Sequence, residues 1–259
     1  MDKLVTIRKW WIRISAGLAV FTPLFMAVSA LGARFGLWSW QFSFGKLVLD
    51  YGFKLLILTL VLSVLAIVFS FVMKPRARKN IIVSVLALSV PLIGIGYGKS
   101  IKAKNASLPS IHDITTDTEN VPTFSSAIVN LRGEKSNSLD YVGKIERHSE
   151  KLVSVLQVEA YPDIRTLVLS DTPEVIYARV QNAVKSMGWK TVTDSADTGV
   201  IEATATSFWF GFKDDVIVRV RAAQGGGSRV DIRSVSRVGR SDMGANAARI
   251  RKFRKILGQ

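Results

Sequence analysis

The chain of 259 residues contains no cysteine, which excludes disulfide bonds, thiolate zinc sites and a cysteine nucleophile. Histidine is scarce, because only His112 and His148 occur, so a metal site would need further ligands from other residues. No Gly-x-Ser-x-Gly sequence is present, so the nucleophile elbow of serine hydrolases is missing. No Asp, Glu, Lys, Arg or His lies within the three long apolar runs, which argues against a stand-alone transporter with a proton or ion relay.

The three apolar runs occupy 14–33, 55–73 and 81–98. At a rise of about 1.5 Å per residue, each run spans the roughly 30 Å hydrocarbon core of a bilayer. The sequence therefore predicts a membrane domain over residues 1–104 and a separate domain over residues 105–259. The first run has a basic start and an end rich in small residues, as in a signal peptide. It is longer than the usual apolar region of about 7–15 residues, so we expect a retained helix.

The net charge of +15 is distributed unevenly along the chain. Residues 1–104 carry 14 basic and 2 acidic residues, residues 105–212 carry 9 and 14, and residues 213–259 carry 12 and 4. Much of the positive charge therefore flanks the predicted spans. Because no basic run accompanies a recognisable nucleic-acid-binding fold, we expect the lipid bilayer, and no nucleic acid, as a partner.

Short basic loops predict the orientation. Four basic residues precede the first span, and four lie in the KPRARKN segment at 74–80. Six lie on the other side of the membrane, three between the first and second spans and three after the third. The positive-inside rule then places the N-terminus in the cytoplasm and the C-terminal domain in the periplasm, with the chain in a bacterial inner membrane. The connection at 34–54 is rich in aromatic residues, which favour the headgroup layer, so we expect an interfacial helix or a re-entrant segment there.

The second half of the chain shows the patterns of a mixed domain. Residues 111–149 are rich in turn residues and predict an extended arm, with one helical stretch near 140–156. Alternating and apolar segments predict strands at 164–169, 189–193, 200–210, 215–223 and 228–238. Helices are expected from a cap at Ser170 or Asp171 to Gly188, and over 241–257. The order β-α-β-β-β-β-α predicts a two-layer α+β domain, with an antiparallel sheet and both helices on one face.

Four separated motifs carry a family resemblance. They are IHDITTD at 111–117, YPDI at 161–164, FWFGFKDDVIVRVR at 208–221 and SRVDIRSVSRVGRSDMGANAARI at 228–250. In this order they resemble the domain-of-unknown-function family numbered 1499, over roughly residues 108–257. The resemblance implies a shared fold and supplies no activity. The three spans lie outside it.

Arginines gather on the outward side of the last two strands. If Gly225–Gly227 form the turn, Arg221 lies opposite Asp231 and Arg219 lies opposite Arg233. Opposed like charges are destabilising unless an anionic group lies between them. That group is either a carboxylate of the domain, which we favour, or a bound phosphate or carboxylate. Candidate acids are Asp117, Asp163 and Glu202.

A second candidate is the start of the last helix, where free backbone N–H groups and nearby arginines are typical of anion sites. Simple capping by Asp242 explains the same residues, and we favour it. Together, the ligand-binding candidates are Arg219, Arg233, Arg237, Arg240, Ser241, Asp242 and Arg249. The supporting residues are Asp117, Tyr161, Asp163, Arg221 and Asp231.

His112 and Asp113 are the only candidate catalytic residues. A pair of this kind suggests acid–base chemistry or a metal site, but Asx and Thr turns explain the motif equally and are favoured. We expect no metal and no cofactor. The stretch Phe208–Phe212 predicts a core strand, and a lipid-binding patch is the alternative if Trp209 is exposed.

The sequence therefore favours a non-enzymatic envelope protein. Three helices anchor an α+β domain that binds a partner protein, an anionic small molecule or a lipid headgroup through its arginines. The first alternative is a hydrolase-like enzyme using His112 with Asp113, which lacks an evident nucleophile. The second is an accessory subunit of a larger membrane complex, with the uncharged spans as the interface.

Overall fold

The computed structural model describes residues 2–74, 78–146 and 149–258. They form two compact units. One comprises Met1–Lys104 together with Phe208–Gly211, and the other comprises Asn105–Ser207 together with Phe212–Gln259. Part of the basic 74–80 segment, and His148, lie outside the described residues.

The helical unit contains three helices that are long and apolar enough to cross a membrane. They are α1 (Asp2–Arg34), α2 (Phe53–Val72) with the preceding π-helical segment η1 (Phe42–Gly52), and α3 (Arg78–Ala106). The three predicted spans are confirmed as helices, and each helix continues beyond its apolar run. The prediction for the aromatic connection was wrong, because from Phe42 onward it forms the first turns of the second long helix.

Small polar side chains lie between α1 and α2. The hydroxyls of Ser15 and Ser63 are 3.0 Å apart, and those of Thr22 and Thr59 are 3.2 Å apart. All four side chains are buried. Small residues let two helix backbones approach closely, and hydroxyl pairs add hydrogen bonds where water is absent. This contact explains why two helices without a charged interface pack side by side.

The second unit is built on one antiparallel sheet with the strand order β1-β6-β5-β4-β3. The strands are β1 (Asp113–Thr115), β2 (Leu167–Leu169), β3 (Lys190–Ser195), β4 (Val200–Thr206), β5 (Lys213–Ala222) and β6 (Ser228–Ser236). Both β1 and β2 pair with the same edge of β6, at opposite ends. The antiparallel α+β fold is thereby confirmed, and β6 pairs with three other strands, β1, β2 and β5.

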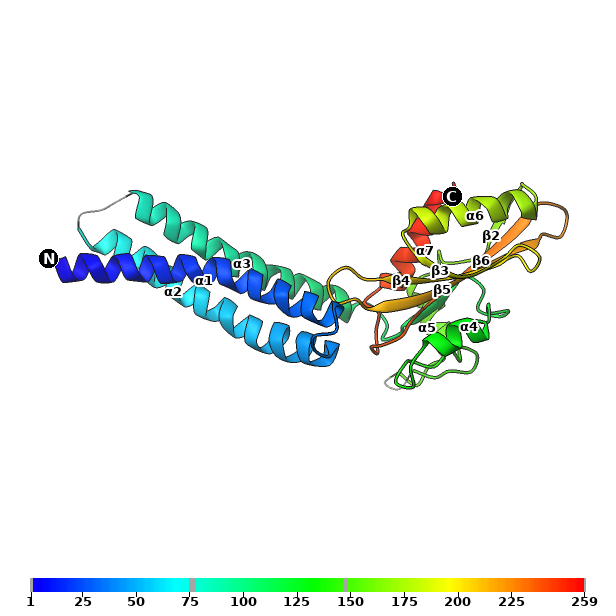
Figure 1. Ribbon diagram of the computed structural model, residues 1–259, viewed down its shortest axis with the longest axis horizontal. Helices are drawn as coiled ribbons and strands as arrows, with labels where there is room; N and C mark the ends of the chain where they lie inside the picture. Colours follow the sequence, from blue (N-terminus) through cyan, green and yellow to red (C-terminus); the bar gives the residue numbers. More distant parts are fainter. Residues whose placement is uncertain (1, 75–77, 147–148, 259) are drawn as a thin grey trace. The chain divides into compact units, whose positions relative to one another are not determined.

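Helices cover both faces of this sheet. Helices α6 (Pro173–Ser186) and α7 (Ala245–Ile256) lie on one side, and α4 (Ser126–Leu131) and α5 (Val153–Ala160) lie on the other (Figure 1). The larger core lies under α6 and α7, where Ile250 and Phe253 pack with the inward valines of β5 and β6. A smaller core joins Ile128 of α4 to Ile217 and Val235 of the sheet.

The arm over the second face contains structure that the sequence did not predict. Strand β1 and helix α4 were missed, and the helix predicted near 140–156 lies mainly later, as α5. Gln157 of α5 fixes the arm, because its amide exchanges hydrogen bonds with the backbone N–H and C=O of Thr115 at 2.9 and 2.7 Å. Its side chain is fully buried, so these bonds satisfy groups that would otherwise be costly.

Three predicted boundaries need correction. Strand β4 ends at Thr206, so the aromatic stretch that follows is a loop and not a core strand. The cap before α6 is Thr172, and not Ser170 or Asp171. The last helix begins at Ala245, four residues later than expected, because Asp242 bonds the preceding turn.

Candidate functional site

The arginines of β5 and β6 stand in a different register from the one expected. Arg219 pairs with Asp231 and Arg221 pairs with Arg229, while Arg233 faces Ile217. The predicted Arg219–Arg233 opposition was wrong, because Ala222 already pairs with Ser228 and the loop has five residues in place of three. This shift of two residues keeps every side chain on its expected face and brings an acid opposite Arg219.

Asp231 holds two of these arginines. Its Oδ2 lies 3.0 Å from Arg219 Nη2 and 2.7 Å from Arg221 Nη2, and its Oδ1 accepts the Thr166 hydroxyl at 2.6 Å. The Asp231 side chain is fully buried. Asp117 adds a second carboxylate, 3.8 Å from Arg219 and 3.6 Å from Arg221. The carboxylate that the sequence required beside Arg219 is therefore supplied within the domain.

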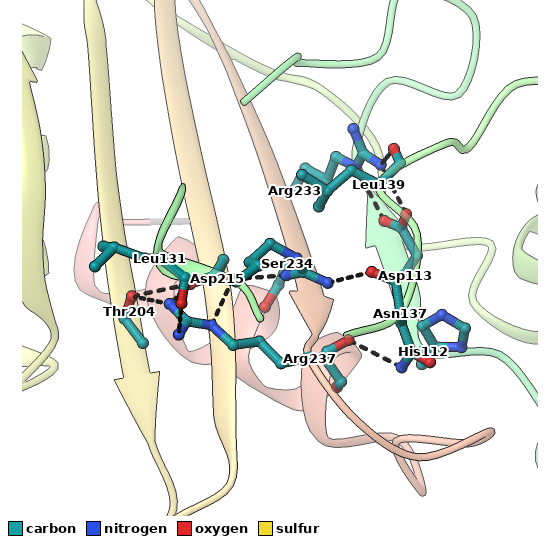
Figure 2. Close-up of polar contacts among 12 residues, drawn as sticks. His112, Asp113, Leu131, Asn137, Leu139, Thr204, Asp215, Arg233, Ser234 and Arg237 are labelled. Atoms are coloured by element: carbon teal, nitrogen blue, oxygen red, sulfur yellow. Dashed lines mark hydrogen bonds and ion pairs between the residues drawn. The ribbon is translucent and has the colours of Figure 1, made fainter. Parts of the chain in front are cut away.

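Arg233 forms the most enclosed ion pair. Its Nε and Nη2 donate to the two Asp113 oxygens at 3.0 and 2.7 Å, and Nη2 also donates to the Leu139 carbonyl (Figure 2). Its Nη1 donates to the Pro122 carbonyl at 2.9 Å. Arg233 is 3% exposed and Asp113 is 1% exposed. Two-point pairing of this kind fixes a guanidinium in one orientation. The two residues thus fasten β1 to β6.

Arg237 is bound in the same way. Its Nε and Nη2 lie 2.9 and 2.7 Å from the two oxygens of Asp215, which also accepts from Arg132 at 2.6 Å (Figure 2). Asp215 is fully buried and also accepts the Thr204 hydroxyl at 2.9 Å. Burial lowers the pKa of Arg132, and the hydrogen bond that Arg132 donates to Asp215 opposes that effect. One carboxylate therefore serves two arginines from different elements.

The start of α7 is occupied by the chain itself. Asp242 accepts the backbone N–H groups of Gly244 and Asn246, both at 2.8 Å. Burial raises the pKa of Asp242, and these bonds oppose the shift. Ser241 accepts the N–H of Met243 at 3.1 Å. Arg249, the fifth residue of α7, points to the sheet, where it donates to Asp214 and to the Ser234 hydroxyl.

The remaining two supporting residues lie near α7. Asp163 pairs with Arg251 through both oxygens at 2.6 Å, on an exposed surface, and the hydrogen bond from Arg251 lowers its pKa. Tyr161 is 3% exposed and packs in the larger core. Burial raises its pKa, and the Arg251 guanidinium lies 5.5 Å from its ring centre. Asp163 therefore forms a surface ion pair with α7, and Tyr161 is part of the larger core.

A different set of groups meets beside His112. Its Nδ1 lies 3.2 Å from the Arg240 carbonyl, and its Nε2 lies 3.3 Å from Lys144 Nζ. A carbonyl oxygen only accepts, so Nδ1 carries the proton and Nε2 accepts from the lysine. Burial lowers the pKa of His112, and the charge of Lys144 lowers it further. Both effects favour the neutral imidazole, whose Nε2 can accept a hydrogen bond.

His112 does not form the expected pair with Asp113. Neighbouring residues at the start of β1 project to opposite sides, and the Asp113 carboxylate is engaged by Arg233. The side chain that contacts His112 is that of Lys144 instead. Burial also lowers the pKa of Lys144, which lies in the same partly enclosed space.

These groups line a cavity of about 480 Å³. Its walls come from the start of β1, from the arm and from the loop before α7, and they comprise Ser110, Ile111, His112, Asp113, Asn137, Ser138, Lys144, Ile145, Glu146, Val153 and Arg240. Among the described residues, neither Lys144 nor the exposed Arg240 forms an ion pair. The cavity is large enough for a small ligand and offers two cationic side chains to it.

Sequence reasoning found His112 and Arg240 but missed Lys144 and Asn137. Both lie in the turn-rich arm, where no periodic pattern marks which side chains point inward. No group of three or more histidines or acids that could hold a metal ion occurs in residues 2–74, 78–146 and 149–258. The chemistry available in the cavity is therefore hydrogen bonding and charge pairing from Lys144, Arg240 and the His112 imidazole, with the carboxylate residue Glu146 also in the wall.

Comparison with known proteins agrees with the motifs. The model of a family described as "Protein of unknown function (DUF1499)" matches residues 113–257, which is more than half of the chain. No curated protein matches the chain. The matched range begins at β1 and contains every strand and the helices α4 to α7.

Proposed function

The chain belongs to the DUF1499 family of proteins of unknown function, preceded here by three apolar helices, and we propose that its domain binds a small anionic ligand at the membrane surface. The ligand is a carboxylate or a phosphate, and it occupies the cavity beside His112. The domain acts as a binding module and not as an enzyme. The observation that carries the proposal is the pair of cationic side chains, Lys144 and Arg240, left without a carboxylate partner in one cavity.

The contrast with the other arginines supports this choice of site. The arginines of β5 and β6 that the sequence suggested, such as Arg233 and Arg237, already hold buried carboxylates. A ligand would have to displace Asp113 or Asp215, which would leave a buried charge unpaired at a cost of several kcal/mol. Lys144 and Arg240 require no such displacement. Arg240 is also exposed, so its guanidinium can turn toward a ligand.

The chemistry of binding follows from the hydrogen bonds. Lys144 donates to an anion through the N–H groups that His112 does not use, and Arg240 adds a planar pair of donors. A bound negative charge favours the protonated forms of both Lys144 and His112. Binding near neutral pH should therefore be accompanied by proton uptake. A surface patch that only screens charge would bind the same anion without proton uptake.

The direct test is calorimetric titration of the full chain in a mild detergent with inorganic phosphate and, separately, with acetate. Lys144→Gln should weaken binding at least about tenfold, since it removes a charged donor worth roughly 1.5–3 kcal/mol. Lys252→Gln, on the exposed side of α7, is the matched control and should bind as the original chain does. Equal binding by both variants would reject the cavity as the site.

Two sources could supply the same chemistry, a soluble anion or the headgroup of an anionic lipid. Nanodiscs of phosphatidylcholine and nanodiscs containing phosphatidylglycerol separate them. If the natural ligand is a headgroup, phosphatidylglycerol should compete with phosphate for the cavity. If it is a soluble anion, phosphate should bind equally in both kinds of disc.

We also place the chain in a bacterial inner membrane, with its N-terminus in the cytoplasm and the domain in the periplasm. The support is the density of basic residues before the first span and in the 74–80 segment. Alkaline phosphatase fused after Gly258 should be active in intact bacteria, and the same enzyme fused after Arg78 should be inactive. The reverse pattern would overturn the orientation.

A further inference from the structure

The loop between β4 and β5 holds aromatic side chains in a tight turn. Its ends are joined by Ser207 N–H donating to the Phe212 carbonyl at 2.8 Å and by Phe212 N–H donating to the Ser207 hydroxyl at 2.9 Å. Gly211 has φ +67°, a left-handed conformation that glycine adopts without strain. The four residues Phe208–Gly211 are thus presented on a closed loop at the end of a hairpin.

The aromatic side chains at the tip are exposed. Phe208 is 67% exposed and Trp209 is 51% exposed, and their rings meet edge to face with centres 5.1 Å apart. Rings of this size each offer about 150–250 Å² of mainly apolar surface, so exposure to water is unfavourable. The loop at the other end of β5, Ala223–Gly227, contains no aromatic residue. The exposed aromatic surface is therefore specific to one end of the hairpin.

Covalent connection keeps this domain near a bilayer. Helix α3 has 29 residues and is about 43 Å long, which exceeds the roughly 30 Å hydrocarbon core. Lys99, Lys102 and Lys104 lie near its end, as expected where a span leaves the membrane. Strand β1 begins seven residues after Ala106, a distance of at most about 25 Å. The domain that carries the hairpin loop is thus tethered close to the headgroup layer.

We propose that the loop Phe208–Gly211 inserts the exposed side chains of Phe208 and Trp209 into the interfacial layer of the bilayer that anchors the chain. Tryptophan favours this layer because its ring is apolar and its N–H can bond to headgroups or water. Lys213, exposed at the start of β5, adds a charge that attracts anionic headgroups. The insertion gives the domain a second attachment, so that the tether and the loop together fix its orientation at the surface.

The absence of cysteine makes a direct test possible. Phe208→Cys introduces one thiol at the tip and keeps Trp209, and Gln224→Cys places the matched control in the exposed loop at the other end of β5. Each full-length variant is labelled with an environment-sensitive fluorophore and reconstituted into vesicles of phosphatidylethanolamine and phosphatidylglycerol. Hydrogen exchange of β4 and β5 establishes that both variants are folded.

The label at position 208 should emit at shorter wavelength than the label at 224. Lipids with a spin label near the headgroup should quench it, and aqueous iodide should quench it several-fold less than it quenches the control. Replacing Trp209 with alanine in the Phe208→Cys background should move both signals toward those of the control. Iodide quenching at 208 equal to that at 224 would overturn the proposal. Protection from iodide without quenching by the spin-labelled lipid would also overturn it, since the loop would then contact protein.

Discussion

Replacing Arg233 with methionine tests the ion-pair network at its most enclosed point. Methionine keeps much of the apolar stem but removes the guanidinium, which donates twice to Asp113 and once each to the carbonyls of Pro122 and Leu139. Asp113 is 1% exposed, so water cannot replace these donors without opening the structure. Breaking a buried pair by removing one partner typically costs about 3–5 kcal/mol, and we expect a loss in that range.

The assay is urea titration of the full chain in mild detergent, with hydrogen exchange of the β5 and β6 amides as the readout. A loss of this size raises their exchange through opening of the sheet by roughly two to three and a half orders of magnitude. Arg229→Met is the matched control on the same strand. Arg229 is exposed and lies 3.9 Å from Asp117, so its loss should cost below about 1 kcal/mol.

A double variant separates the charge from the packing. Adding Asp113→Asn to Arg233→Met removes the unpaired carboxylate, so the combined loss should be smaller than the sum of the two single losses. The reasoning fails if Arg233→Met costs no more than Arg229→Met. It also fails if phosphate stabilises the original chain but not the Arg233→Met variant. The Arg233 guanidinium would then be an open anion site.

The other predictions concern a turn, a histidine and a cap. Gly227→Ala should destabilise the domain by more than about 1 kcal/mol in urea titration, because the new Cβ would lie 2.2 Å from the Leu169 carbonyl at φ +79°; an unchanged midpoint would contradict this geometry. Because the pKa of His112 is lowered in the folded state, the unfolded chain binds more protons than the folded chain below about pH 6.5, and the free energy of unfolding should fall as the pH falls from there. His112→Gln should flatten this dependence. Parallel stability-against-pH profiles of the variant and the original chain would contradict a lowered pKa for His112. Asp242→Ala should cost about 1–2 kcal/mol and raise exchange in the first turn of α7; no change in that turn would exclude capping.

The sequence predicted the elements with strong periodicity. The three spans, both long helices of the domain and the four consecutive strands β3 to β6 follow from apolar patterns that many residues share. The shared pattern also fixed which side of β5 and β6 carries the arginines. The pattern could not fix the register of β5 against β6. The observed five-residue loop after Ala222 and the three-residue loop suggested by the consecutive glycines place every side chain on the same face of the sheet, so the apolar pattern fits both.

The arm could not be predicted from local pattern. Strand β1 has three residues and exists because β6 offers an open edge and Gln157 bonds its backbone. Neither contact is visible in the motif IHDITTD, which has the composition of a turn. The candidate site depends on this arm, since Lys144 meets His112 only after it folds across the sheet. Long-range packing, and not propensity, therefore decides which residues share the cavity.

The most direct test of anion binding in the cavity is the protonation of His112 itself. The chain has two histidines, so His148→Gln leaves one imidazole, and its ring resonances can be observed in histidine-labelled full chain in detergent. Titration with inorganic phosphate at constant ionic strength should shift these resonances and raise the pKa of His112, and Lys144→Gln should weaken the response. Ring resonances and a pKa that stay unchanged up to saturating phosphate would contradict the account.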